Sequence, residues 1–357
     1  MGGFQGDFAS LSAHDLGGAA IKAAIERAGI APEKVDEVLF GNCLMAGQGQ
    51  APARQAALKG GLPLSAGAVT LSTMCGSGMK ATMLAHDMLL AGSASEFIFR
   101  VSAWAAQQGG AGAGVWLPPQ HYGDYSAAAQ AWGLRRVERV DMAQLAWACD
   151  PASPLGQPQA GLALLARQAA VTVLDRAYEP LRLDGSLALT QEDLLRVWQL
   201  WTPNKALGLT GVRAAYVIAP LGALQDVAQL ERLAPSWLLG AHGVALLQAW
   251  VQAPTQAWLK DSLQTLRAWK ARQMALCAEL GWHCLASSTN YFCARPEVQG
   301  RALAQALTGL RAQGIKLRDA TSFGLPAHVR LGVLAPQAQD ALQMAWLRLT
   351  HKGRALS

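Results

Sequence analysis

Four side chains in the middle of the chain could together bind and activate an aldehyde. Lys205 offers a primary amine that can form a Schiff base, and Arg213 can bind a phosphate through two parallel hydrogen bonds. Asp175 ends an apolar segment, and Tyr178 follows it closely. A carboxylate can keep a ring nitrogen protonated, and a phenol can hydrogen-bond a ring oxygen. These are the groups that a protein needs to hold pyridoxal 5'-phosphate (PLP), so the sequence predicts PLP as the cofactor.

Further motifs stand around these four residues in a fixed order along the chain. Tyr122 and Ser153 lie upstream in Tyr- and Pro-containing turns, and Arg318 and Arg330 lie downstream in separate short motifs. A lysine and an arginine alone form salt bridges or helix caps more often than a cofactor site. The order and spacing of the whole set instead resemble fold-type I, class I/II PLP enzymes over residues 93–357. Within that family the chain looks most like the branch of histidinol-phosphate aminotransferase and threonine-phosphate decarboxylase.

The resemblance implies a role for each matching residue. Lys205, Asp175 and Tyr178 would be catalytic, and Arg330, with Arg318, would bind the substrate and its α-carboxylate. The implied cofactor-binding residues are Ala94, Ser95, Tyr122, Ser153, Asp175, Tyr178, Thr202, Lys205 and Arg213. Two supporting positions depart from the family pattern: Ser153 stands where an asparagine is usual, and Asn204 where a serine often precedes the lysine.

The activity that the resemblance implies is transamination or decarboxylation of an amino acid or an amino-acid phosphate. Lys205 would move the Cα proton in transamination, whereas in a decarboxylase the carboxylate would leave instead. Which bond breaks depends on how the substrate is held, and the sequence leaves both reactions open. Members of the family are homodimers in which an N-terminal arm reaches the neighbouring active site, so a homodimer is expected.

The first quarter of the chain resembles a different family. Residues 2–93 look like the N-terminal part of a thiolase of the acetyl-CoA acetyltransferase type, with Cys75 in the position of the acylated cysteine. A helix N-terminus would lower the pKa of that thiol. The base and second cysteine that thiolases carry in their C-terminal half have no counterpart here. Two alternative interpretations therefore remain: a thiolase-like acyltransferase that uses Cys75, and a non-enzymatic fusion product.

Composition changes at the junction of the two resemblances. All 12 Trp and all 5 Tyr lie after residue 100, whereas most Met lie before residue 93. We therefore predict a truncated thiolase-like segment over 1–93, an incomplete PLP-binding large domain over 94–235, and a helical connection with a small C-terminal domain over 236–357.

The fold class predicted is α/β, with a doubly wound, mostly parallel sheet and a smaller C-terminal α/β domain. Strands predicted over 145–149, 170–175 and 197–202 alternate with helices, and Asp175 falls where a strand ends. Helices are also expected over 15–29, 76–90 and 97–108, strands over 37–40 and 137–140, and a long helical tract over 235–282.

Several other classes of protein are disfavoured. Apolar runs stay shorter than the roughly 18 residues that a membrane span requires, and the first residues do not form a secretory signal. The six Cys are scattered without paired metal-ligand spacing, which predicts a cytoplasmic protein with no metal site. A net charge of +6 is spread over dispersed arginines rather than a nucleic-acid-binding motif. Neither a nucleic-acid partner nor a membrane partner is expected.

Overall fold

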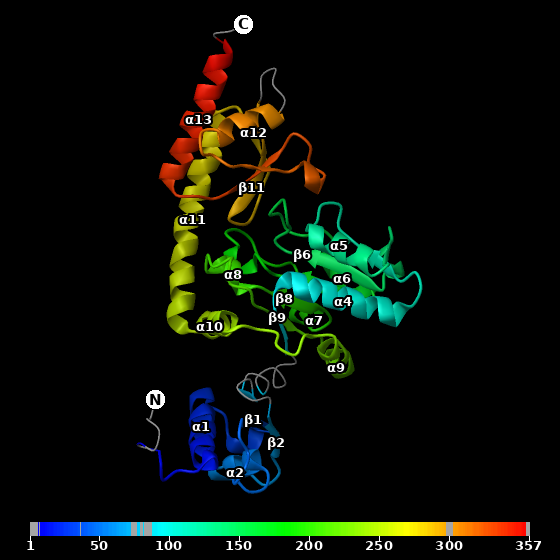
Figure 1. The fold of residues 1–357 in the computed structure, drawn as a ribbon, viewed down its shortest axis with the longest axis vertical. Helices are drawn as coiled ribbons and strands as arrows, with labels where there is room; N and C mark the ends of the chain where they lie inside the picture. The colour runs from blue at the N-terminus through cyan, green and yellow to red at the C-terminus, as the bar shows by residue number, and fades with distance from the viewer. Residues whose placement is uncertain are drawn as a thin grey trace. The chain divides into compact units, whose positions relative to one another are not determined.

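The computed structural model describes residues 6, 8–35, 37–72, 77–78, 81, 88–297 and 303–354. It divides into two compact units, Met1–Met88 and Leu89–Ser357, which are shown in Figure 1. The chain therefore changes from one unit to the other five residues before the junction predicted from composition.

The first unit packs two helices against a parallel strand pair. Its elements are α1 (Ala13–Ala28), the 3₁₀ turn η1 (Pro32–Lys34), β1 (Glu37–Gly41), α2 (Pro52–Lys59) and β2 (Gly67–Leu71), with β1 and β2 parallel. Ser12 and Asp15 form a capping box at the start of α1, and Gly29 ends it at φ 64°. A small core around Ile21, Val38 and Ala56 holds the layers together. The helix and the first strand predicted here are confirmed.

Within the described residues, seven strands form the large sheet of the second unit in the order β3-β9-β8-β7-β6-β4-β5. These strands are β3 (Met88–Ala91), β4 (Gly114–Trp116), β5 (Arg135–Arg136), β6 (Leu145–Cys149), β7 (Val171–Asp175), β8 (Trp198–Trp201) and β9 (Ala215–Ile218). The pairs from β5 to β8 are parallel, and β9 runs antiparallel to β8. The predicted mostly parallel α/β sheet is confirmed.

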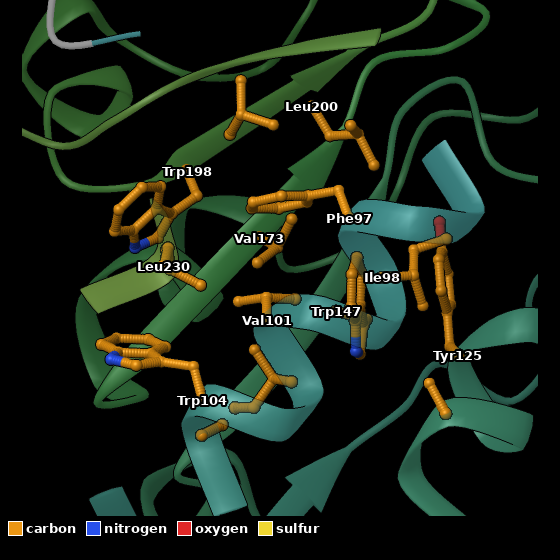
Figure 2. Close-up of a cluster of buried hydrophobic side chains, with 14 of the residues drawn as sticks. Phe97, Ile98, Val101, Trp104, Tyr125, Trp147, Val173, Trp198, Leu200 and Leu230 are labelled. Carbon is orange, nitrogen blue, oxygen red and sulfur yellow. The ribbon is translucent and has the colours of Figure 1, made fainter. Parts of the chain in front are cut away.

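Helices cover both faces of this sheet because its side chains alternate between two apolar layers. Trp147 and Val173 belong to the layer beneath α4 (Ala94–Gly109), α5 (Gly123–Ala131) and α9 (Leu224–Arg232). The adjacent residues Ala148 and Leu174 belong to the opposite layer, beneath α6 (Leu162–Gln168) and α7 (Gln191–Leu194). Figure 2 shows the first layer, in which side chains of α4 meet those of the strands. Asp175 lies two residues after Val173 on the same strand, so its side chain points to the same face of the sheet, toward α4 and α5.

A long helix links the large sheet to a second, smaller one. The predicted helical tract over 235–282 is two helices, α10 (Ala241–Trp250) and α11 (Ala253–Glu279). Pro254 sits in the first turn of α11, where its missing N–H costs no hydrogen bond, and it prevents the two from being continuous. In Figure 1, α11 runs from α10 to the side of α13 (Pro336–Arg354).

The small sheet is antiparallel, with the order β10-β11-β13-β12 in the described residues. Its strands are β10 (His283–Cys284), β11 (Tyr291–Arg295), β12 (Arg318–Asp319) and β13 (Val329–Gly332), and α12 (Leu303–Arg311) and α13 pack with it. Among the described residues, no helix combines the length and apolarity needed to cross a membrane.

One sequence-based element prediction is only partly confirmed, and a second is wrong. Most of the helix predicted over 76–90 lies outside the described residues: Ser77, Gly78 and Ala81 are helical, but the last residues of the prediction belong to the edge strand β3 (Met88–Ala91). Its apolar residues follow a helical pattern as well as a strand pattern, and sheet pairing decides between them. The strand predicted over 137–140 is displaced: the edge strand is Arg135–Arg136, and a 3₁₀ turn η2 follows at Val140–Met142.

Candidate functional site

A cavity lies at the carboxyl ends of the central parallel strands, where an open α/β sheet places its ligands. Its lining comes from the ends of β6, β7 and β8, from the start of α4, and from segments far along the chain. The lining residues are Ser93, Ala94, Ser95, Tyr122, Cys149, Ser153, Asp175, Ala177, Tyr178, Thr202, Asn204, Lys205, Thr210, Arg213, Ala214, Phe323 and Arg330.

Lys205 lies on α8 (Pro203–Ala206), a single turn directly after β8. Its Nζ is 3.4 Å from Oγ1 of Thr202 and 5.0 Å from the centre of the Tyr178 ring. Since no carboxylate oxygen lies within 4.0 Å of this amine in the described part of the chain, the lysine is free of a strong ion pair. An amine in this setting can act as a nucleophile or move a proton.

Asp175 is the last residue of β7 and is only 5% exposed. Its Oδ2 accepts a hydrogen bond of 2.7 Å from the Tyr125 hydroxyl, and its Oδ1 accepts one of 2.9 Å from the backbone N–H of Ala177. Both oxygens are therefore held in place while the side chain still lines the cavity. A buried carboxylate of this kind can hold a proton on a basic ring nitrogen.

The start of α4 provides a second polar region of the cavity wall. Ser93 caps this 16-residue helix, and its side chain accepts from the N–H of Glu96. Ser93, Ala94 and Ser95 line the cavity together with Arg213. Free backbone N–H groups at a helix N-terminus, beside a guanidinium, favour a bound anion such as phosphate.

Tyr122 and Cys149 line the same cavity and are both neutral. Burial raises the pKa of Tyr122, although a hydrogen bond from the Ser95 hydroxyl opposes this. Burial, reinforced by the negative charge of Asp175, raises the pKa of the Cys149 thiol strongly. The Cys149 thiol therefore stays protonated, so it is unsuited to nucleophilic catalysis.

Arg330, from the small sheet, is held against two tyrosines. Its Nη2 donates to the Tyr178 hydroxyl at 3.1 Å, and its guanidinium stacks on the Tyr291 ring with 3.7 Å to the centroid. Tyr291 in turn donates to the carbonyl of Ala152 at 2.9 Å. Within the described residues, Arg330 and Arg213 have no carboxylate oxygen within 4.0 Å. Two cationic groups without an acidic partner make the cavity suited to anions.

A buried ion pair fixes the two loops that carry Ser153 and Tyr178. Arg182 pairs with the fully buried Asp150 and, at 2.6 Å, with Glu179 of η3 (Glu179–Leu181). The Thr289 hydroxyl, from the segment before β11, donates to the Leu181 carbonyl at 3.0 Å. Thr289, which precedes the small sheet, thus also holds the loop that follows Tyr178 in place.

The structure brings together most of the residues that the sequence predicts for the site. Lys205, Asp175, Tyr178, Tyr122, Ser153, Thr202, Arg213, Ala94, Ser95 and Arg330 all line the cavity. Arg318 does not line it: this residue is exposed on β12 and stacks over Phe323 at 5.2 Å. Cys75 lies outside the described residues. The described part of the chain contains no cluster of three or more His, Cys, Asp or Glu side chains that could hold a metal ion.

Some lining or supporting residues were not assigned a role from the sequence. Tyr125, Tyr291 and Phe323 contact the site through tertiary packing rather than through a local motif. Tyr125 follows Tyr122 by three positions, and this repeat of a tyrosine beside a predicted site residue could have indicated a role for it. Asn204 donates to the Val212 carbonyl through Nδ2 at 3.1 Å, while its buried Oδ1 has no hydrogen-bond partner among the residues that the structure describes.

Two family models match the chain. The model for aminotransferase class I and II matches residues 147–348, and the model for the thiolase N-terminal domain matches residues 1–99. Acetyl-CoA acetyltransferase from Cupriavidus necator is 53% identical over 94 residues, which are 26% of this chain and 24% of that protein. The chain thus spans about a quarter of the length of the curated relatives that it matches.

Solved structures resemble the second part of the chain in fold. Histidinol-phosphate aminotransferase from Clostridium acetobutylicum superposes with a TM-score of 0.64 at 16% identity, covering 74% of this chain and 84% of that one. L-threonine-O-3-phosphate decarboxylase from Porphyromonas gingivalis gives 0.59 at 15% identity, covering 76% and 87%. Histidinol-phosphate aminotransferase from Sinorhizobium meliloti, in complex with PLP, gives 0.61 at 20% identity, covering 76% and 78%.

Proposed function

The chain belongs to the class I and II aminotransferase family, and we propose that it is a PLP-dependent enzyme that transaminates or decarboxylates an amino acid or an amino-acid phosphate. One observation carries this proposal: a buried carboxylate lines a single cavity together with a lysine and two arginines that have no acidic partner among the described residues. Each of these groups matches a different part of one cofactor–substrate pair.

The donor set of the cavity fits PLP. The helix N-terminus at Ser93–Ser95 and Arg213 suit its phosphate, and Asp175 suits its ring nitrogen. The Tyr178 hydroxyl suits its ring oxygen, and Lys205 suits its aldehyde. When bound, this cofactor withdraws electrons from the Cα of an amino acid and so weakens the bonds to that carbon.

The side chains of this protein would then divide the work between them. Lys205 would exchange its amine for that of the substrate and afterwards carry a proton to or from Cα. Asp175 would hold a proton on the ring nitrogen throughout, because its oxygens are fixed by Tyr125 and Ala177. Arg330 would bind the substrate carboxylate in a bidentate manner. Tyr122 would stack on the ring.

The family supports a proposal for the substrate class and for the assembly. Solved relatives of the same fold are named for histidinol phosphate and L-threonine-O-3-phosphate, which supports an amino acid or its phosphate ester as substrate. We further propose a homodimer working in the cytoplasm.

We expect Arg330→Gln to raise the KM for the amino-acid substrate by about 100-fold, because a desolvated carboxylate would lose its paired guanidinium. The Kd for PLP should change little, since Arg330 does not belong to the phosphate end of the cavity. Steady-state assays with 2-oxo acid formation and CO₂ release measured in parallel would also tell transamination from decarboxylation.

Two further arginine variants sharpen this experiment. Arg295→Gln removes an exposed arginine from the neighbouring strand β11 and should leave KM unchanged. Arg318→Gln tests the role that the sequence predicts for Arg318, whose side chain lies outside the cavity lining. An unchanged KM for Arg330→Gln, in protein that still binds PLP, would rule out Arg330 as the carboxylate anchor.

A further inference from the structure

We infer that Tyr125, behind the cavity wall, is a positioning residue that fixes and orients the Asp175 carboxylate toward the cofactor ring. This inference rests on the proposed PLP site. It assigns a role to a side chain that does not itself line the cavity.

The hydrogen bonds around Asp175 leave it a single orientation. The Tyr125 hydroxyl donates to Oδ2 at 2.7 Å, and the Ala177 N–H donates to Oδ1 at 2.9 Å. Hydrogen bonds to a charged acceptor are among the stronger ones in proteins. Removing the Tyr125 hydroxyl would free Oδ2 and allow the carboxylate to rotate about its χ2 angle.

Packing prevents the Tyr125 ring from moving away. The residue is fully buried, and its ring stacks on Trp147 with centroids 4.3 Å apart and planes 9° apart. Figure 2 shows the two rings side by side, next to Ile98 of α4. The Tyr122 ring contacts Tyr125 edge-on at 5.8 Å. The donor therefore sits on a rigid support formed by α4, α5 and β6.

The electrostatics keep Tyr125 a hydrogen-bond donor. Burial, together with the adjacent charge of Asp175, raises the pKa of Tyr125 well above that of an ordinary tyrosine. The phenol therefore stays protonated at every pH at which the enzyme would work. Because Tyr125 does not line the cavity, it is not placed to act there as a base. Its contribution is therefore made through Asp175.

The test compares two tyrosine-to-phenylalanine variants of the full chain. Tyr125→Phe removes the hydroxyl but keeps the stacked ring. Tyr216→Phe is the matched control, because that hydroxyl accepts from Trp250 Nε1 at 3.3 Å, in a cluster that includes neither Tyr125 nor Asp175. We expect Tyr125→Phe to weaken PLP binding roughly tenfold and to reduce the visible circular dichroism of bound PLP. Tyr216→Phe should leave the PLP affinity and the circular dichroism unchanged, even if it lowers the thermal stability as much as Tyr125→Phe does.

A double-mutant cycle separates positioning from a general packing effect. In an Asp175→Asn background, Tyr125→Phe should cause no further change in PLP affinity. If wild-type protein binds PLP but Tyr125→Phe keeps its affinity and circular dichroism, the positioning role is overturned and the proposed function stands. Equal losses in both backgrounds would likewise overturn it. A folded wild-type protein that does not bind PLP would overturn the positioning role and the proposed function together.

Discussion

Replacing Lys205 with alanine should abolish turnover, with a loss of at least roughly 10³-fold in kcat, because the variant loses both its nucleophilic amine and its proton carrier. No other lysine could replace this amine, since Lys205 is the only lysine among the described residues that line the cavity. The PLP-dependent visible absorbance band should disappear as well. The measurement is kcat with the best amino-acid substrate, together with a PLP titration.

A second variant distinguishes lost chemistry from lost charge. Lys205→Arg keeps a cation near Thr202 and Tyr178 but cannot form the covalent linkage, so it should be as inactive as the alanine variant. Lys260→Ala, which removes an exposed lysine of α11, should behave as wild type. Substantial activity in Lys205→Arg would show that the chemistry does not pass through this amine.

Asp175→Asn should lower kcat by roughly 10³-fold while the protein still folds and still binds PLP weakly. An asparagine keeps the shape of the side chain: its Oδ1 can accept from the Ala177 N–H, and its Nδ2 can donate to the Tyr125 hydroxyl in place of the bond that Asp175 accepts. It lacks the negative charge that holds a proton on the ring nitrogen, so the electron-withdrawing power of the cofactor falls. Steady-state kinetics and the position of the visible band would measure the two effects separately.

The control for this variant is an aspartate of the same loop region outside the cavity. Asp184 has a side chain that is 71% exposed, at 4.0 Å from Lys270, and Asp184→Asn should leave kcat unchanged. Near-wild-type kcat in Asp175→Asn would contradict the role of this carboxylate. A loss that could be fully explained by lower PLP occupancy would also contradict a specific electrostatic role.

The residues that could be predicted from the sequence are those with local signatures. Lys205, Arg213 and Asp175 stand beside glycines, prolines and strand ends whose local patterns can be read without a structure. The strands β6, β7 and β8 were predictable because continuous apolar runs of this length form buried parallel strands. The site geometry follows from the sheet, since the ends of adjacent parallel strands must lie together.

Features that depend on distant packing were not predictable. Tyr125 reaches Asp175 across 50 positions in sequence, and Tyr291 supports Arg330 from a different strand of the small sheet. The edge strand β3 has a sequence that also fits a helix, and its pairing with β9 determines its structure. Arg318 belongs to a motif that predicted a substrate contact, but η4 (Thr321–Phe323) places Phe323, rather than Arg318, at the cavity.

The junction between the two resemblances lies inside the site. Residues 1–99 match the thiolase N-terminal domain, yet within that range Ser93, Ala94 and Ser95 line the cavity and begin α4. The strand β3, also within that range, is part of the large sheet. The last residues matched by the thiolase model therefore serve the aminotransferase fold. The thiolase-like alternative, an acyltransferase using Cys75, depends on residues outside the described part of the chain.

The measurement that tests the central claim most directly is peptide mapping after borohydride reduction of the full chain incubated with PLP. We predict that one phosphopyridoxyl group per chain is found on the peptide that contains Lys205, accompanied by loss of the visible band. The label should be absent in Lys205→Ala under the same conditions. Labelling spread evenly over surface lysines, or no label on Lys205 in folded protein, would contradict the assignment of this cavity as a PLP site.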